Sequence, residues 1–205
     1  SHEEGSAKKT FFNLPTYLQE ENTPRVNSQP KHRAYLKISE GCMKRCAFCA
    51  IPLIRGNLQS RKIENIVNEA KLLAASGVKE LIIISHDFTD FGLDLKRSNP
   101  AAVENPVELL RQLAEVEGIK WIRVLYLYPD GITPEMIDLI KNNSKFVKYF
   151  DMPLQHINND VLKKMNRKMT REEITDVLIM IRKEIQDAVI IKQFIDALCV
   201  LPVPE

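Results

Sequence analysis

Hydrophobic positions along the chain follow two alternating patterns. Short stretches rich in apolar residues predict strands at 33–38, 80–84, 121–126, 146–152 and about 188–191, and the one at 80–84 has the dense apolar run of a strand buried on both faces of a parallel sheet. Between these runs, apolar residues recur every three or four positions, which predicts amphipathic helices at 60–77, 103–117, from 133 onward and 170–186. Strand and helix alternate about five times, so the pattern favours an α/β fold with a parallel sheet and helices outside it.

Repeated right-handed crossovers curl such a sheet toward a barrel. A complete eight-unit barrel needs about 250 residues, and this chain has 205. We therefore predict a partial, open parallel β/α barrel of about five strand–helix units, truncated relative to the full barrel. The predicted division is a linker or extended arm at 1–32, the partial barrel at 33–191 and an atypical C-terminal tail at 192–205.

Three helix starts have recognisable capping residues. Ser60 is predicted to cap the first helix, Thr133 precedes a first-turn proline, and Thr170 with Glu173 forms a capping-box pattern.

The composition is that of an ordinary soluble globular protein, with 44% hydrophobic and 27% charged residues. No apolar run is long enough to cross a bilayer, and no secretory leader is recognisable, so we expect a cytoplasmic protein with no membrane partner. Three of the four cysteines are clustered, which suits a metal site in a reducing compartment better than a disulfide framework. The fourth, Cys199, is interpreted as an ordinary thiol.

The cluster consists of Cys42, Cys46 and Cys49, spaced C-x3-C-x2-C directly after the first predicted strand. Three thiolates are one fewer than an ordinary 4Fe-4S cluster requires. One iron would then be open to a substrate, as the open position is in catalytic zinc sites. The alternatives are a structural zinc site and three unrelated buried thiols. Zinc sites usually add a second ligand pair further along, and none follows here.

Basic residues are concentrated around these cysteines. The stretch 31–62 holds eight Lys or Arg residues and one acid, Glu40. The excess could balance a negatively charged thiolate cluster, attract an anionic ligand or nucleic acid, or form a solvated basic face.

Polar residues also follow other predicted strands. Ser85, His86 and Asp87 come directly after the second strand, and Gln155 and His156 follow the fourth. Active sites of parallel α/β folds are built at the C-terminal ends of the strands, where the cysteine loop is also predicted.

The cysteine motif, with Phe48 just before the third cysteine, resembles that of the radical S-adenosylmethionine superfamily. Further stretches are similar to the methylthiotransferases, and most of all to their RimO branch, which modifies an aspartate of a small-subunit ribosomal protein. These stretches are Tyr35–Cys42, Ile51-Pro52, Arg55-Gly56, Ser60-Arg61 and Met152–His156. The transfer-RNA branch usually has Arg-Gly-Cys and Gln-Ser-Gly where this chain has Glu40-Gly41-Cys42 and Gln155-His156-Ile157.

The resemblance implies that Cys42, Cys46 and Cys49 hold a 4Fe-4S cluster. Its fourth iron would bind S-adenosylmethionine, and one electron would cleave this cofactor to a 5′-deoxyadenosyl radical. The resemblance further implies an adenine contact from Phe48, a ribose or methionyl contact from Gln155, and a contact to the methionyl amine from Asp87 or His86. Core packing is the alternative for Phe48, and a structural role is the alternative for His86.

The same resemblance implies partners, namely a small-subunit ribosomal protein as substrate and an external electron donor. Transfer RNA is the alternative substrate, and a non-catalytic truncated fragment is the alternative of a different class. The full-length family also has a second 4Fe-4S cluster, held by three cysteines of an N-terminal domain, and a C-terminal β-barrel. Neither has a counterpart in this sequence, and residues 192–205 depart from the family pattern. We therefore expect this chain alone not to complete sulfur insertion.

Overall fold

Parallel strands form the centre of the structure, a computed structural model that describes residues 18, 27–28 and 30–194. Within this part of the chain, the five parallel strands are β1 (Arg33–Lys37), β4 (Glu80–Ile84), β5 (Trp121–Val124), β6 (Tyr149–Gln155) and β7 (Val189–Phe194). β1, β4 and β5 pair in that order in one sheet, and β6 and β7 pair in another.

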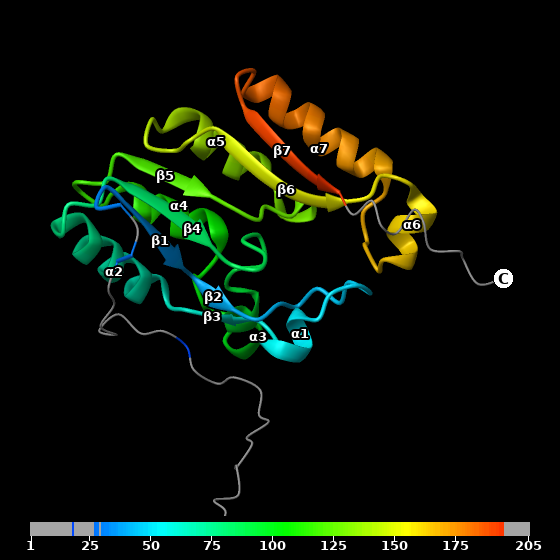
Figure 1. The fold of residues 1–205 in the computed structure, drawn as a ribbon, viewed down its shortest axis with the longest axis horizontal. Helices are drawn as coiled ribbons and strands as arrows, with labels where there is room; N and C mark the ends of the chain where they lie inside the picture. Colours follow the sequence, from blue (N-terminus) through cyan, green and yellow to red (C-terminus); the bar gives the residue numbers. More distant parts are fainter. Residues whose placement is uncertain (1–17, 19–26, 29, 195–205) are drawn as a thin grey trace, which may run out of the picture.

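The two sheets are joined along one curved arc. A bridge between Ile122 and Phe146 and a hydrogen bond from Leu127 N to Asp151 O (2.8 Å) connect β5 to the β6 side. Figure 1 shows the strands as an open arc from β1 to β7. The prediction of a partial, open parallel barrel is thereby confirmed.

Helices cover the outer side of this arc. They are α2 (Ile63–Ala75), α4 (Pro106–Ala114), α5 (Pro134–Asn142) and α7 (Arg171–Glu184), and each contacts the next (Figure 1). The strand residues beneath them are almost fully buried: Ala34, Leu36, Leu81, Ile83, Ile122 and Val124. Because side chains alternate along a strand, their neighbours face the inner side of the arc.

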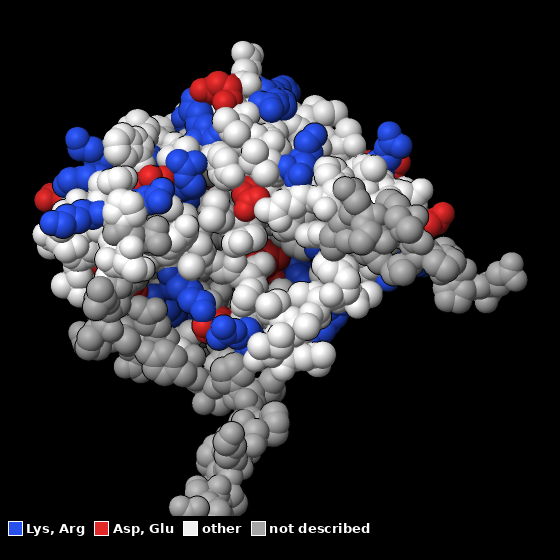
Figure 2. Space-filling model, in the orientation of Figure 1, with Lys and Arg blue, Asp and Glu red and all other residues white. Residues whose placement is uncertain are grey.

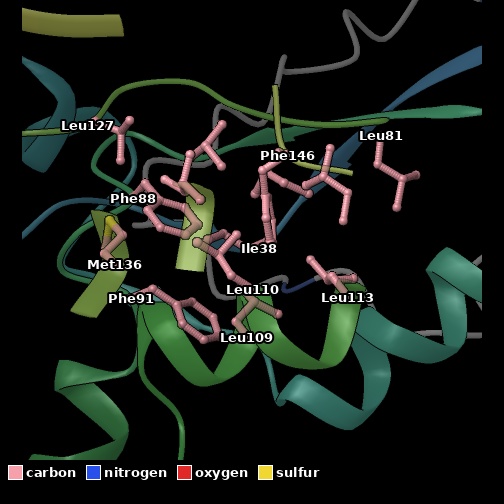
Figure 3. Packing of buried hydrophobic residues seen from close by; sticks show 14 of the residues in the cluster. Ile38, Leu81, Phe88, Phe91, Leu109, Leu110, Leu113, Leu127, Met136 and Phe146 are labelled. Atoms are coloured by element: carbon pink, nitrogen blue, oxygen red, sulfur yellow. The ribbon is translucent and has the colours of Figure 1, made fainter. Parts of the chain in front are cut away.

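Apolar side chains from both layers interlock in the core. Figure 3 shows Leu109, Leu110 and Leu113 of α4 packed among residues that reach down from the sheet and its loops, including Leu81 and Phe88. The apolar residues of the strands are buried for this reason, since a strand covered by helices needs apolar residues on its buried face.

The pattern of apolar residues did not predict several short elements, because each is too short to show a period. They are β2 (Ser39–Glu40), α1 (Ile51–Ile54), β3 (Gln59–Ser60), α3 (Leu93–Ser98), the 3-10 turn Pro129–Gly131 and α6 (Asn159–Lys164). Most of them lie in the connections that leave the C-terminal ends of the parallel strands.

The structure confirms two predicted caps and corrects the third. Thr133 Oγ1 accepts a hydrogen bond from Met136 N (3.2 Å), and Thr170 and Glu173 form the reciprocal capping box. Ser60 does not cap α2, because it lies in β3 and its Oγ accepts a hydrogen bond from Gly92 N (2.9 Å). α2 begins after Lys62 without a side-chain cap.

Some strand boundaries also differ from the prediction. β5 ends at Val124, because Tyr126 has a positive φ of 58° and leaves the sheet. β6 begins at Tyr149 rather than at Phe146. β7 extends to Phe194, so it includes the first three residues of the predicted tail. Most of the predicted arm and the rest of the tail, with Cys199, lie outside the described residues, and the domain division remains a prediction. None of the described helices combines the length and apolar character needed to cross a membrane.

Candidate functional site

The C-terminal ends of the parallel strands enclose a pocket of about 180 Å³ beside the cysteine loop. This pocket brings together all seven side chains for which the sequence predicted a metal or cofactor contact: Cys42, Cys46, Phe48, Cys49, His86, Asp87 and Gln155. They come from three separate strand ends, so tertiary folding brings His86, Asp87 and Gln155 to the cysteine loop.

The cysteine loop is held by tight backbone contacts at its start. Gly41 has a φ of +66°, and a Cβ there would lie 2.0 Å from the carbonyl oxygen of Asn57, so a side chain at this position would require the backbone to move. The next residue, Cys42, is buried and accepts a hydrogen bond from Lys44 N at its Sγ (3.3 Å). Burial raises the pKa of the Cys42 thiol to about 11. A bound metal reverses that preference, because a coordinating thiol is deprotonated outright.

The three thiols line the same pocket but do not converge on the position of a single metal ion. In the described part of the chain, no three His, Cys, Asp or Glu side chains are arranged as ligands of a single metal ion. A cubane cluster sets a different requirement, because each thiolate binds a different iron atom. A cluster of this kind therefore needs thiols distributed around one hollow.

Phe48 lies at the rim of this pocket with 40% of its surface exposed. The alternative of simple core packing for this ring is therefore wrong. An exposed aromatic face beside the cysteine pocket is available to stack on a planar ligand.

His86 and Asp87 leave β4 side by side and are both perturbed by burial. His86 Nε2 is buried without a hydrogen-bond partner, and burial lowers the pKa of this imidazole. Asp87 Oδ1 accepts hydrogen bonds from Thr89 N (2.9 Å) and Thr89 Oγ1 (2.7 Å). Burial, with the nearby charge of Asp90, raises the pKa of Asp87 to about 6. Unpartnered polar atoms and shifted pKa values are typical of functional sites.

Gln155 ends β6 with a φ of +71°, in the left-handed region that side chains other than glycine rarely adopt. Two other non-glycine residues of the described chain have a positive φ, Tyr126 and Asn166. Tyr126 lines the same pocket, and Asn166 Nδ2 donates a hydrogen bond to Arg45 O of the cysteine loop (2.6 Å). Backbone strain is thus concentrated around the pocket, as it often is around functional sites.

Further pocket residues were missed by the sequence analysis. They are Lys44, Tyr126, Tyr128, Pro153, Arg167 and Gln193. The position of the two tyrosines, just after the third strand, could have identified them by the same reasoning as for His86. No sequence signal indicates Arg167, which follows the unpredicted helix α6.

Tyr128 lies between two cations. Lys44 Nζ is 4.5 Å from the centre of its ring, and Arg167 Cζ is 3.8 Å from it. Lys44 also pairs with Asp130 (2.6 Å) and Asp90 (3.3 Å). Burial raises the pKa of the Tyr128 hydroxyl, so the phenol stays neutral beside the cysteine loop.

A second, larger hollow of about 520 Å³ lies against the inner face of the arc. Tyr35, Lys37 and Leu125 line it, and it shares His86 and Tyr126 with the cysteine pocket. The two hollows therefore adjoin, and together they offer a ligand both the cysteine edge and the inner face of the sheet.

The basic stretch around the cysteines does not form one uniform surface. Arg61 pairs with buried Glu69 (2.7 Å), and Lys62 pairs with Glu104 (3.2 Å). On the face of the molecule drawn in Figure 2, Lys and Arg side chains of the whole chain lie in several separate groups, with acidic side chains among them. The local excess of charge in the sequence is thus partly neutralised by acids from other segments.

The fold and the cysteine pocket agree with what comparison with known proteins shows. Residues 36–199 match the model of the radical SAM superfamily, and the chain belongs to this family. The match begins within β1 and includes all the later strands of the described arc to β7.

Two relatives with high sequence identity show which branch of the superfamily this chain resembles. The chain is 72% identical over 193 residues to the ribosomal protein uS12 methylthiotransferase RimO of Bdellovibrio bacteriovorus, covering 94% of this chain and 42% of that protein. It is 51% identical over 171 residues to RimO of Caldanaerobacter subterraneus, covering 83% of this chain and 38% of that protein. The chain is therefore a RimO-like member of the superfamily, and it spans about two fifths of the length of these relatives.

Solved structures support the fold. The cobalamin-dependent S-adenosylmethionine radical enzyme OxsB matches with a TM-score of 0.62 at 14% identity, over 80% of this chain and 24% of that one. The radical S-adenosylmethionine methyltransferase TsrM from Kitasatospora setae, solved with cobalamin and a [4Fe-4S] cluster bound, matches with a TM-score of 0.55 at 16% identity, over 83% of this chain and 34% of that one. At these identities the likeness concerns the fold alone.

Proposed function

We propose that this chain is the catalytic core of a radical S-adenosylmethionine methylthiotransferase that acts on a small-subunit ribosomal protein, uS12. The observation that carries the proposal is the shared pocket, which joins three cysteines to His86 and Gln155 from two other strand ends. The 72% identity to a protein named uS12 methylthiotransferase supports this substrate over transfer RNA.

The pocket residues fit a 4Fe-4S cluster bound by Cys42, Cys46 and Cys49. Two features of the structure support this fit beyond the spacing of the cysteines. The thiols surround one hollow, and a buried cation, Arg167, donates a hydrogen bond to Cys46 Sγ (3.5 Å). Thiolate clusters carry negative charge, and a nearby buried cation compensates it.

When bound, the cluster would supply the electron that cleaves S-adenosylmethionine to methionine and a 5′-deoxyadenosyl radical. The contribution of the chain is position and the exclusion of water. We assign Phe48 to the adenine, Gln155 to the ribose or methionyl group, and Asp87 or His86 to the methionyl amine. Asp87 suits an ammonium group, because its Oδ2 is buried, makes no hydrogen bond and lies 3.7 Å from the ammonium of Lys44.

The remaining parts of the proposal concern the whole protein. We place the reaction in the cytoplasm, where ribosomal proteins are available, with an external electron donor as a second partner. The second 4Fe-4S cluster expected for the full-length family would need ligands other than Cys42, Cys46 and Cys49. Sulfur insertion is therefore assigned to the longer protein, and radical generation to this chain.

Iron and sulfide counts on the anaerobically reconstituted chain test the proposal. We expect one 4Fe-4S cluster per chain, and 5′-deoxyadenosine after addition of S-adenosylmethionine and a one-electron reductant. Cys42→Ser should abolish both, because only two of the three thiolates that hold the cluster would remain. Cys199→Ser is the matched control and should retain both.

A chain that binds zinc instead, or that takes up iron but forms no 5′-deoxyadenosine, would contradict the proposed function. The latter result would favour a non-catalytic fragment. Substrate choice is tested with the full-length protein, by mass spectrometry of uS12 and of transfer RNA after the reaction. Methylthiolation of transfer RNA alone would overturn the assignment to uS12.

A further inference from the structure

Arg167 is a buried cation that points into the cysteine pocket. Only 9% of its surface is exposed, and its guanidinium has three partners. Nη1 donates to Cys46 Sγ (3.5 Å), Nη2 donates to Pro153 O, and the plane lies on the ring of Tyr128 (3.8 Å to its centre).

These partners leave the charge of Arg167 uncompensated. No carboxylate in the described part of the chain forms an ion pair with it, whereas Lys44, on the same tyrosine ring, has three acidic neighbours. A buried charge without a counter-charge is costly. A negative group in the pocket would offset this cost, and a cluster held by thiolates is such a group.

The backbone around Arg167 is fixed to the cysteine loop. Ala47 N donates to Met165 O (3.0 Å), and Asn166 Nδ2 donates to Arg45 O (2.6 Å). The segment after α6 is thus attached to both sides of Cys46. This attachment places the backbone of Arg167 beside Cys46, and the contacts with Pro153 O and the Tyr128 ring hold the guanidinium next to the sulfur of Cys46.

We propose that Arg167 is a positioning residue that sets the reduction potential of the cluster through Cys46. The inference rests on the proposed function, because it assumes that Cys46 is a ligand. Hydrogen bonds to cluster sulfurs and nearby charge are known determinants of the potential. Reduction adds one electron from an external one-electron reductant and no proton, so the cluster becomes more negative by one charge. A fixed cation beside the sulfur stabilises the reduced form more than the oxidised form, and it therefore raises the potential.

The test is a redox titration of the anaerobically reconstituted chain, followed by electron paramagnetic resonance of the reduced cluster. Arg167→Gln keeps a polar group and removes the charge. We expect the ratio of reduced to oxidised cluster, at a fixed applied potential, to fall about ten-fold, which is about 59 mV for a one-electron couple. Arg167→Lys keeps the charge but loses the planar fork, so it should shift the potential in the same direction by a smaller amount.

Arg123→Gln is the matched control. Arg123 also lies on a tyrosine ring, that of Tyr149 (5.1 Å), but it pairs with Glu80 (2.9 Å) and does not line the cysteine pocket. Its replacement should leave the potential of the cluster unchanged.

An unchanged or more positive potential, in whichever Arg167 variant folds and takes up the cluster, overturns the inference. Loss of cluster uptake by both variants, with unchanged thermal unfolding, also overturns it, because Arg167 would then act in assembly. Failure of the wild-type chain to take up a cluster is a different result, and it would count against the proposed function itself.

Discussion

The two sides of the strand arc have opposite characters. The outer side, between the sheet and its helices, consists of fully buried aliphatic residues such as Leu36, Ile83 and Leu110. The C-terminal edge contains backbone strain at Gln155 and unpartnered polar atoms at His86. The outer layer therefore supplies most of the stability, whereas the C-terminal edge is less stable because its backbone and polar atoms are arranged for a site. Three changes test this contrast, and a cavity in the outer layer should have the largest effect.

Leu110→Ala removes a fully buried side chain from the face of α4 that packs on the sheet. We expect the free energy of unfolding to fall by about 2–5 kcal/mol, because the change loses apolar burial and leaves a cavity. Chemical denaturation measures it. Leu72→Ala, at a position with 61% exposure on α2, is the control and should change stability little. Similar losses in both variants would contradict the assignment of the core to this layer.

Asp87→Asn should raise the free energy of unfolding near neutral pH, whereas Leu110→Ala lowers it. The folded protein raises the pKa of Asp87 from 3.8 to about 6, so the folded state binds this proton more tightly than the unfolded state. The stabilisation is complete below about pH 3.8 and is lost as the pH rises through 6. Asn is neutral throughout and can accept the same hydrogen bonds from Thr89. In the cluster-free chain, its advantage over Asp should therefore grow by roughly 2–3 kcal/mol between pH 4 and pH 7.5.

Denaturation curves at the two pH values measure this difference. Asp176→Asn, at an exposed position on α7, should show no such dependence on pH. An advantage of Asp87→Asn that is the same at both pH values would mean that burial does not destabilise the Asp87 carboxylate.

Substitutions of Gln155 should change the free energy of unfolding least. They distinguish the role of its backbone strain from the role of its side chain in binding. Gln155→Ala and Gln155→Gly both remove the amide, but only glycine adopts a φ of +71° without strain. The glycine variant should be more stable than the alanine variant by about 1 kcal/mol, because the relieved strain exceeds the entropic cost of glycine. Both variants should bind S-adenosylmethionine more weakly in the reconstituted protein. Equal stability of the two would indicate that the backbone at this position is not strained.

Much of the fold could be predicted because apolar residues recur along the chain with a clear period. The strand at 80–84 has the predicted boundaries, and the capping box at Thr170 opens α7 as expected. Errors occur where tertiary contacts override local preference. Ser60 is a good capping residue by type, yet its hydroxyl is used to hold Gly92 in a neighbouring turn. Phe146 continues an apolar run, but it lies before β6 and makes only a bridge to β5.

The candidate site divides in the same way. Local spacing identified Cys42, Cys46 and Cys49, and the position at strand ends identified His86, Asp87 and Gln155. Neither spacing nor position at a strand end could identify Arg167. This residue follows a helix of six residues and lies 121 positions from Cys46 in the sequence.

The sequence by itself determined the order of strands and helices, the three thiols and the edge of the sheet at which they emerge. These properties depend on side-chain periodicity and on residue spacing, which are local. Only the tertiary structure decided which cation lies beside which sulfur, which carboxyl is buried and where the backbone is strained. Those properties depend on contacts between distant segments, because burial and charge compensation arise only when the chain has closed around the pocket.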